Sequence, residues 1–133
     1  MKHNKSLNFN TLENEAFALA KTIKGGEVFG LTGKLGSGKT TFVKILGKHL
    51  KIKRKITSPS FRLMHNYEAK TKDRKKIIVY HLDLYRIKDW KEAEALGLKE
   101  IFESKTSVVV IEWANKIKSK LPKNTVWLKF KGL

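Results

Sequence analysis

Residues 33–40 constrain the fold of this chain more than any other feature of its sequence. They read Gly-Lys-Leu-Gly-Ser-Gly-Lys-Thr and match the pattern G-x-x-x-x-G-K-[S/T]. That pattern is informative only where a strand precedes it and a helix follows it. Residues 28–31 form a short apolar run, and residues 40–50 repeat apolar side chains at helical spacing. The sequence therefore predicts a strand, a glycine-rich loop and a helix in that order.

The glycines of this segment indicate a phosphate-binding loop. Gly33, Gly36 and Gly38 allow backbone N–H groups to converge on a phosphate. The helix that follows directs the positive end of its dipole to the same point. We therefore expect the loop to bind the β-phosphate of a nucleotide.

The side chains at the end of the loop have distinct expected roles. Lys39 should bridge the β- and γ-phosphates of ATP, and the Thr40 hydroxyl should be a ligand of Mg²⁺. Thr41 is placed to hydrogen-bond the α-phosphate. Ser37 is also expected to be a phosphate-binding residue of the loop, although its side chain occupies a spacer position of the motif.

The remaining elements are predicted from hydrophobic periodicity. Helices are expected over residues 11–23 and 89–102, the second around Gly97. Residues 61–68 and 77–82 should pair as an antiparallel hairpin, and residues 125–130 should form a last strand. Together these elements predict one domain, residues 1–133. Its expected fold is an α/β, P-loop NTPase-type sheet with central parallel strands, an antiparallel hairpin and helices on both faces.

Two carboxylates are candidates for the metal site. Residues 108–111 are four consecutive branched apolar residues, which is typical of a strand buried on both faces, and Glu112 follows them. A carboxylate at the C-terminal end of such a strand can hold Mg²⁺ or its water, although it could also be a solvent-exposed strand end. Asp83, within residues 81–86, is the second candidate, and its alternative is an ordinary exposed edge.

Composition limits the possible classes of protein. The chain has no cysteine, which excludes disulfides and thiolate metal sites, so Mg²⁺ with oxygen ligands is the expected metal. No apolar run approaches a membrane span and no secretory leader is visible, so a cytoplasmic protein without membrane contact is expected. The net charge of +17 fits either lysine-rich solvated faces or contact with tRNA through a basic surface. Both interpretations stay open.

Four segments give the chain a specific family resemblance. They are residues 33–41, Ser-Pro-Ser at 58–60, His-Leu-Asp-Leu-Tyr-Arg at 81–86, and Ile-Glu-Trp at 111–113. In this order and spacing the chain resembles TsaE, also called the YjeE family, the bacterial ATPase of tRNA threonylcarbamoyladenosine biosynthesis. It departs from the family pattern at Lys34, Ser37 and Ser60, and at residues 114–115.

The resemblance implies both an activity and a biological process. It implies a P-loop fold, slow hydrolysis of Mg-ATP, and support of TsaB and TsaD in making N6-threonylcarbamoyladenosine beside the anticodon of tRNA. By position, Glu112 matches the magnesium-binding glutamate, and Asp83 and Trp113 match residues tied to activity. Residues 58–60, including Ser60, match a segment that senses the γ-phosphate. For Trp113 a core-packing role is the alternative.

Two other classes of protein fit parts of the sequence. A small metabolite kinase would share the phosphate loop but would need an acceptor site and usually a lid with arginines, and no such lid is evident. A basic RNA-binding module would bind RNA without nucleotide, and its affinity would fall steeply with salt. The chain carries no RNP or KH signature.

Overall fold

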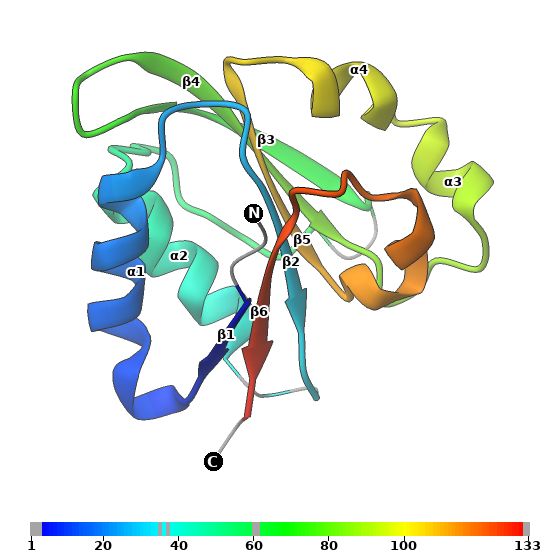
Figure 1. Cartoon of the computed structure of the whole chain (residues 1–133), viewed down its shortest axis with the longest axis horizontal. Helices are drawn as coiled ribbons and strands as arrows, with labels where there is room; N and C mark the ends of the chain where they lie inside the picture. Colours follow the sequence, from blue (N-terminus) through cyan, green and yellow to red (C-terminus); the bar gives the residue numbers. More distant parts are fainter. Residues whose placement is uncertain (1–3, 35, 37, 60–61, 132–133) are drawn as a thin grey trace.

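A computed structural model describes residues 4–34, 36, 38–59 and 62–131 of the chain. Within these residues the chain forms a six-stranded sheet in the order β1-β6-β2-β5-β4-β3 (Figure 1). The strands are β1 Asn4–Leu7, β2 Val28–Thr32, β3 Met64–Lys70, β4 Lys76–Asp83, β5 Ser107–Glu112 and β6 Val126–Phe130. The α-helices are α1 Leu12–Thr22, α2 Lys39–His49, α3 Trp90–Glu94 and α4 Leu98–Glu103, with 3₁₀ turns η1 Phe9–Thr11 and η2 Ala114–Lys120.

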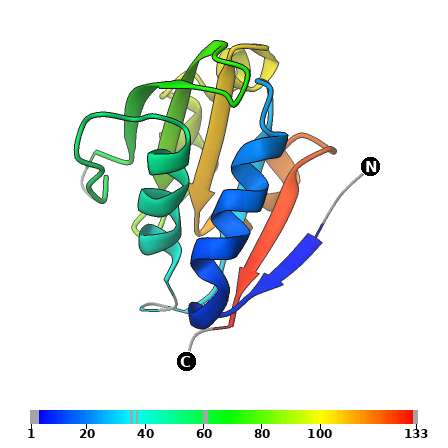
Figure 2. The same ribbon diagram turned by 90° about the vertical axis from the view of Figure 1, so that its left-hand side faces the viewer.

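Strand directions confirm the predicted fold class. All neighbouring pairs run parallel except β3 and β4, which form the expected antiparallel hairpin. Helices lie on both faces of the sheet, with α1 and α2 on one side and α3, α4 and η2 on the other (Figure 1). Figure 2 shows α1 and α2 side by side on their face of the sheet. The phosphate-loop sequence connects β2 to α2, as predicted.

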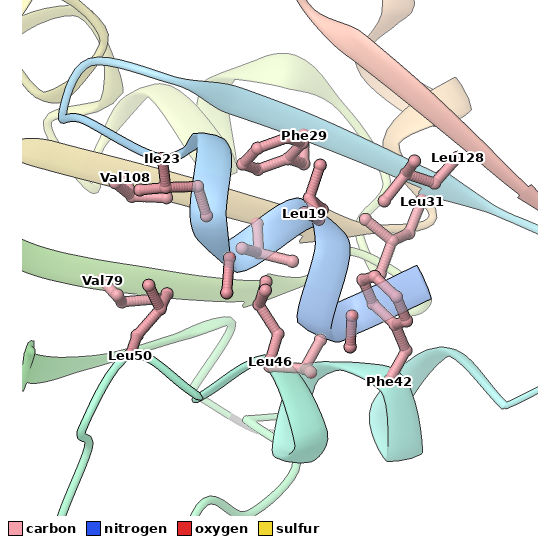
Figure 3. Packing of buried hydrophobic residues seen from close by; sticks show 14 of the residues in the cluster. Leu19, Ile23, Phe29, Leu31, Phe42, Leu46, Leu50, Val79, Val108 and Leu128 are labelled. Carbon is pink, nitrogen blue, oxygen red and sulfur yellow. The ribbon is translucent and has the colours of Figure 1, made fainter. Parts of the chain in front are cut away.

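Strand β5 contributes to both hydrophobic cores, as its apolar run predicts. Val108 and Val110 pack in the core beneath α1 and α2, where Leu19 and Phe42 meet the sheet (Figure 3). Their neighbours on β5, Val109 and Ile111, pack in the second core under α3, α4 and η2. Packing on both faces holds β5 in the middle of the sheet, and this also holds its last residue, Glu112, in place.

Three features of the fold differ from the sequence predictions. Strand β1 was not predicted, because its residues Asn-Lys-Ser-Leu lack the apolar alternation that identifies a half-buried strand. The helix expected over residues 89–102 is divided into α3 and α4 at Gly97, whose φ of 81° is left-handed. Strand β3 begins only at Met64, after Leu63, which also has a positive φ of 66°.

Two of the predicted site residues are not described by the structure. The expected phosphate-loop contact Ser37 and the expected sensor Ser60 lie outside the described residues.

In the part of the chain that the structure describes, no helix is both long enough and apolar enough to cross a membrane.

Candidate functional site

The candidate site lies where three parallel strands end. Strands β2, β5 and β4 are neighbours, and in the register of the sheet Leu31 and Asp83 both stand opposite Glu112. Because parallel strands end at one edge of a sheet, the loop after β2 meets the last residues of β4 and β5 there. The predicted phosphate loop and both predicted carboxylates therefore share one edge.

The loop backbone favours glycine at the two positions that the motif specifies, Gly33 and Gly38, and also at Gly36. Gly33, Gly36 and Gly38 have φ values of 146°, 76° and 99°, a region that side chains with a Cβ rarely adopt. Gly38 is also the N-cap of α2, and no side chain among the described residues caps that helix terminus. The first N–H groups of α2 are thus left for a ligand at the mouth of the loop.

Lys39 is the most buried lysine at this edge. Its side chain is folded back into the loop, where Nζ donates to the carbonyl oxygens of Gly33 at 2.5 Å and Lys34 at 3.0 Å. Nζ also lies 4.3 Å from the ring centroid of Trp113. Burial lowers the pKa of Lys39 from its usual 10.5, while the negative charges of Glu112 and Asp83 oppose that shift. The ammonium is therefore poorly hydrated and depends on the groups around it.

Glu112 joins three elements of the site. Its carboxylate, on a residue only 3% exposed, accepts from the Thr40 hydroxyl of α2, which lies 3.0 Å from each oxygen. The same carboxylate lies 2.6 Å from Nε2 of His81, which is fully buried on β4. The other ring nitrogen of His81, Nδ1, has no hydrogen-bond partner among the described residues. Glu112 is thus a buried strand end rather than the solvent-exposed one that the sequence left possible.

Thr40 and Glu112 suit a magnesium ion. Mg²⁺ binds oxygen ligands octahedrally at about 2.0–2.1 Å, which places adjacent ligand oxygens about 3 Å apart. The Thr40 hydroxyl and the Glu112 carboxylate already have that separation. Among the described residues no group of three or more His, Asp or Glu side chains is arranged to hold a metal ion.

Asp83 and Trp113 lie beside this centre. Asp83 is 7% exposed and accepts from the backbone N–H of Tyr85 at 3.0 Å and from the Ser58 hydroxyl at 3.4 Å. Trp113 is half-buried, has a left-handed φ of 61°, and its ring lies 5.1 Å from that of Tyr85. Asp83 therefore links the segment beginning at Ser58 to the end of β4, and it is not an ordinary exposed edge residue.

The structure brings together most of the predicted site residues. Gly33, Lys39, Thr40, Glu112 and Trp113 lie around the loop, and Asp83 stands beside Glu112 in the sheet. Thr41 is exposed in the first turn of α2. The binding and catalytic roles of these residues stay predictions.

His81 is a residue of the site for which no role was predicted. The signal available was its alternation with Asp83, which places both side chains on one face of β4. Only the parallel register, in which Asp83 stands opposite Glu112, shows that the face carrying His81 also carries Glu112.

The fold and this edge define a class of protein before any comparison is made. A mainly parallel sheet whose β2–α2 connection is a G-x-x-x-x-G-K-T loop is a P-loop NTPase-type fold. Comparison with known proteins then identifies the family. The family model for "Threonylcarbamoyl adenosine biosynthesis protein TsaE" matches residues 7–132, and the chain belongs to the TsaE family.

Individual relatives agree with this assignment. The chain is 37% identical over 133 residues to the tRNA threonylcarbamoyladenosine biosynthesis protein TsaE of Bacillus subtilis, covering 98% of this chain and 79% of that protein. It is 35% identical to the protein of the same name from Treponema pallidum, covering 86% and 80% of the two chains. A crystal structure of Bacillus subtilis YdiB superposes with a TM-score of 0.67 at 28% identity, covering 94% of this chain and 72% of that one.

The buried pair of His81 and Glu112 should be energetically coupled. We expect a double-mutant cycle of His81→Ala and Glu112→Ala to give a coupling free energy of about 1.5–3 kcal/mol, because a hydrogen bond to a buried charged group is worth about that much. Urea unfolding followed by circular dichroism measures it. A control cycle of His81→Ala with the exposed Lys99→Ala should be additive within about 0.5 kcal/mol. Additivity in both cycles would show that the His81 contact contributes nothing.

Proposed function

We propose that this chain is a Mg-ATP-binding P-loop ATPase that supports biosynthesis of N6-threonylcarbamoyladenosine in tRNA together with TsaB and TsaD. The observation that carries the ATPase proposal is the pairing of Thr40 with Glu112 beside the Lys39 ammonium. The pathway rests on family membership, since the relatives are named for it. Cytoplasmic residence, where tRNA is modified, is part of the same proposal.

Lys39 has the environment expected of a phosphate-binding lysine. Two loop carbonyls hold its ammonium in a poorly hydrated place, and neither of them carries a full charge. Phosphate oxygens would replace these carbonyls with charge-assisted hydrogen bonds, which are about twice as strong as neutral ones. The exchange would also raise the pKa of Lys39, since phosphate charge favours the ammonium form. Binding energy is therefore concentrated on a side chain that the loop already orients.

The loop glycines and the start of α2 would complete the phosphate site. Backbone N–H groups around Gly36, Ser37 and Gly38 would cradle the β-phosphate, and the Thr41 hydroxyl would contact the α-phosphate. Because Thr41 is exposed in the first turn of α2, its hydroxyl is accessible to a ligand at the loop mouth.

Thr40 and Glu112 would hold Mg²⁺, and His81 would fix the Glu112 carboxylate from behind. The ion would supply charge that balances the β- and γ-phosphates. His81 is a positioning residue in this arrangement, because it is fully buried and contacts the carboxylate rather than the nucleotide site. Glu112 thereby keeps one orientation although it lies at the end of a strand.

Asp83 and Trp113 would transmit the state of the nucleotide. Asp83 binds Ser58, the first residue of the segment 58–60, in which Ser60 would sense the γ-phosphate. Trp113 contacts both the Lys39 ammonium and the ring of Tyr85, a residue that is 43% exposed. A change in the position of Lys39 would therefore reach the molecular surface through two aromatic rings. That surface is where we place contact with TsaB and TsaD.

The metabolite kinase is the weaker candidate. It shares the phosphate site, but membership of a family named for threonylcarbamoyladenosine biosynthesis favours an ATPase that serves that pathway. The RNA-binding alternative would make the phosphate loop incidental, and it predicts RNA affinity that needs no nucleotide.

Removing the phosphate-binding lysine should abolish activity without unfolding the protein. We expect Lys39→Ala to lower the rate of ATP hydrolysis by about 100-fold or more. The substitution removes the positive charge that would stabilise the negative charge developing on the phosphates in the transition state. The matched control is Lys44→Ala, an exposed lysine of the same helix that should retain parent activity. Phosphate release measures hydrolysis and circular dichroism checks folding. Parent-level hydrolysis by folded Lys39→Ala would contradict the phosphate-site assignment.

Glu112→Gln tests the metal assignment separately. The amide keeps the shape of the side chain but loses its negative charge, so we expect the Mg²⁺ concentration at half-maximal ATPase activity to rise by about tenfold or more. The comparison variant is Asp83→Asn, which should shift the magnesium midpoint less. An unchanged midpoint for Glu112→Gln, with a raised one for Asp83→Asn, would transfer the metal role to Asp83.

Trp113 should report nucleotide binding. We expect Mg-ATP to change the intrinsic tryptophan fluorescence, because Lys39 would leave the Trp113 ring for the phosphates. Trp113→Phe should lose this change, and Trp90→Phe, which alters the tryptophan of α3, should keep it.

The same residue has a test in the pathway. With purified TsaB, TsaD and unmodified tRNA, Trp113→Ala should lower multiple-turnover modification at least about tenfold while ATP affinity changes only a few-fold. Melting temperatures are measured in parallel, since Trp113 is half-buried. Full modification by a folded Trp113→Ala variant would refute the coupling role.

A further inference from the structure

A second surface, remote from the phosphate loop, is strongly basic. Two adjoining grooves, with cavity volumes of about 650 and 660 Å³, share Lys51, Lys53 and Lys70 in their walls. The second groove adds further cationic residues from α1 and from the β3–β4 turn. We call the shared and added cations the basic face: Lys21, Lys51, Lys53, Lys70, Lys72 and Arg74.

The charges of the basic face are only partly balanced nearby. Asp73 lies between Lys72 and Arg74 in the chain, and Glu13 contacts His49, which lines the second groove. Glu68 is the one acidic residue in the wall of the first groove, and the described wall of the second groove contains no acidic residue. Among the described residues, the close contacts between carboxylates and Lys or His nitrogens involve Lys5, His49, His81 and Lys99, and none includes a member of the basic face. Clustered cations that outnumber the nearby carboxylates create a positive potential that a polyanion can neutralise.

An exposed aromatic ring lies within the basic face. Phe17 of α1 is 47% exposed, and its ring centroid lies 5.1 Å from that of His49. The Lys21 ammonium is 4.1 Å from the same ring centroid. An exposed ring beside a cluster of cations can stack on a nucleobase, and the cations would bind the phosphates of the same nucleic acid. An acidic protein partner would supply charge but would have no comparable use for this ring.

The backbone holds two of the cations in an unusual conformation. Lys51 follows the end of α2 with a φ of 63°, and the bonds from Ile52 N–H to Gly47 O and from Lys51 N–H to Lys48 O form a Schellman motif. Glycine is the usual residue at that position. Arg74, in the β3–β4 turn, likewise has a φ of 67°. Both sites carry a long cationic side chain where glycine would suit the backbone better.

We propose that the basic face binds RNA, with phosphates in the two grooves and a base stacked on Phe17. That the RNA is tRNA rests on the proposed function. The basic face surrounds the C-terminal end of α2, whereas the phosphate loop lies at its N-terminal end (Figure 1). A helix of 11 residues separates its ends by about 16 Å, so RNA and ATP would occupy different sites.

The test measures binding of a fluorescently labelled, unmodified tRNA transcript by anisotropy over a range of salt concentrations. The test variant combines Lys51→Gly, Lys53→Gln and Lys70→Gln, in which glycine removes a charge at a position that favours it. The matched control combines Lys91→Gln, Lys120→Gln and Lys123→Gln, three exposed lysines outside the basic face. Both variants lose equal charge.

We expect the test variant to raise the dissociation constant about tenfold or more near 150 mM salt and to reduce the salt slope by about 2 to 3, since each lost phosphate contact reduces it by about one. The control should change affinity less than about threefold. Phe17→Ala should weaken binding about fivefold or more with little change of slope, because base stacking releases no counterions.

Three results would overturn the proposal. They are equal weakening by both triple variants, which would indicate diffuse charge; no binding of the transcript at low salt; and equally tight binding of polyglutamate, which would indicate an acidic protein partner. The ATPase proposal is judged apart, because the basic-face variants should hydrolyse ATP at the parent rate and Lys39→Ala should bind the transcript like the parent protein. Each proposal can therefore fail alone.

Discussion

The buried carboxylate of Glu112 is the interaction on which the rest of the candidate site depends. The carboxylate accepts a hydrogen bond from the Thr40 hydroxyl of α2 and contacts the His81 ring of β4. Glu112 itself is the last residue of β5. A buried carboxylate is costly unless hydrogen-bonded, so these contacts hold the three elements at a fixed spacing. The first turn of α2, and with it Lys39, is thereby tied to the sheet by one side chain as well as by the cores around it.

Helix α2 separates two regions of different electrostatic character. Its first turn contains no acidic residue and follows a glycine N-cap, which leaves the positive end of the helix dipole open to an anion. Its last turn carries Lys48 and His49, and Lys51 follows. Positive charge at this position is stabilised by the negative end of the helix dipole. Some of the positive charge at the C-terminal end therefore stabilises the helix. The grooves and the exposed Phe17 are what distinguish this region from an ordinary charged helix end.

The sequence predicts those parts of the fold that depend on local pattern. The loop at residues 33–40, the doubly buried β5 and the β3–β4 hairpin follow from glycine spacing, an apolar run and alternation. Strand β1 could not be predicted, because four residues with one buried leucine form a strand only through pairing with distant β6. The contact between His81 and Glu112 was missed for a similar reason, since it depends on the register between β4 and β5.

Because of the order of strands in the sheet, β2 can pair with its neighbours only late in the synthesis of the chain. Strand β2, which carries the phosphate loop, is flanked by β5 and β6, so both neighbours come from residue 107 onward. During synthesis from the N-terminus, Val28–Thr32 cannot enter its final hydrogen-bonding ladder until most of the chain has been made. Until then an apolar segment with two open edges is exposed to other strands, and such segments are prone to mispairing. A strand that ends up paired on both sides in the folded protein is thus among the most vulnerable while the chain is being made.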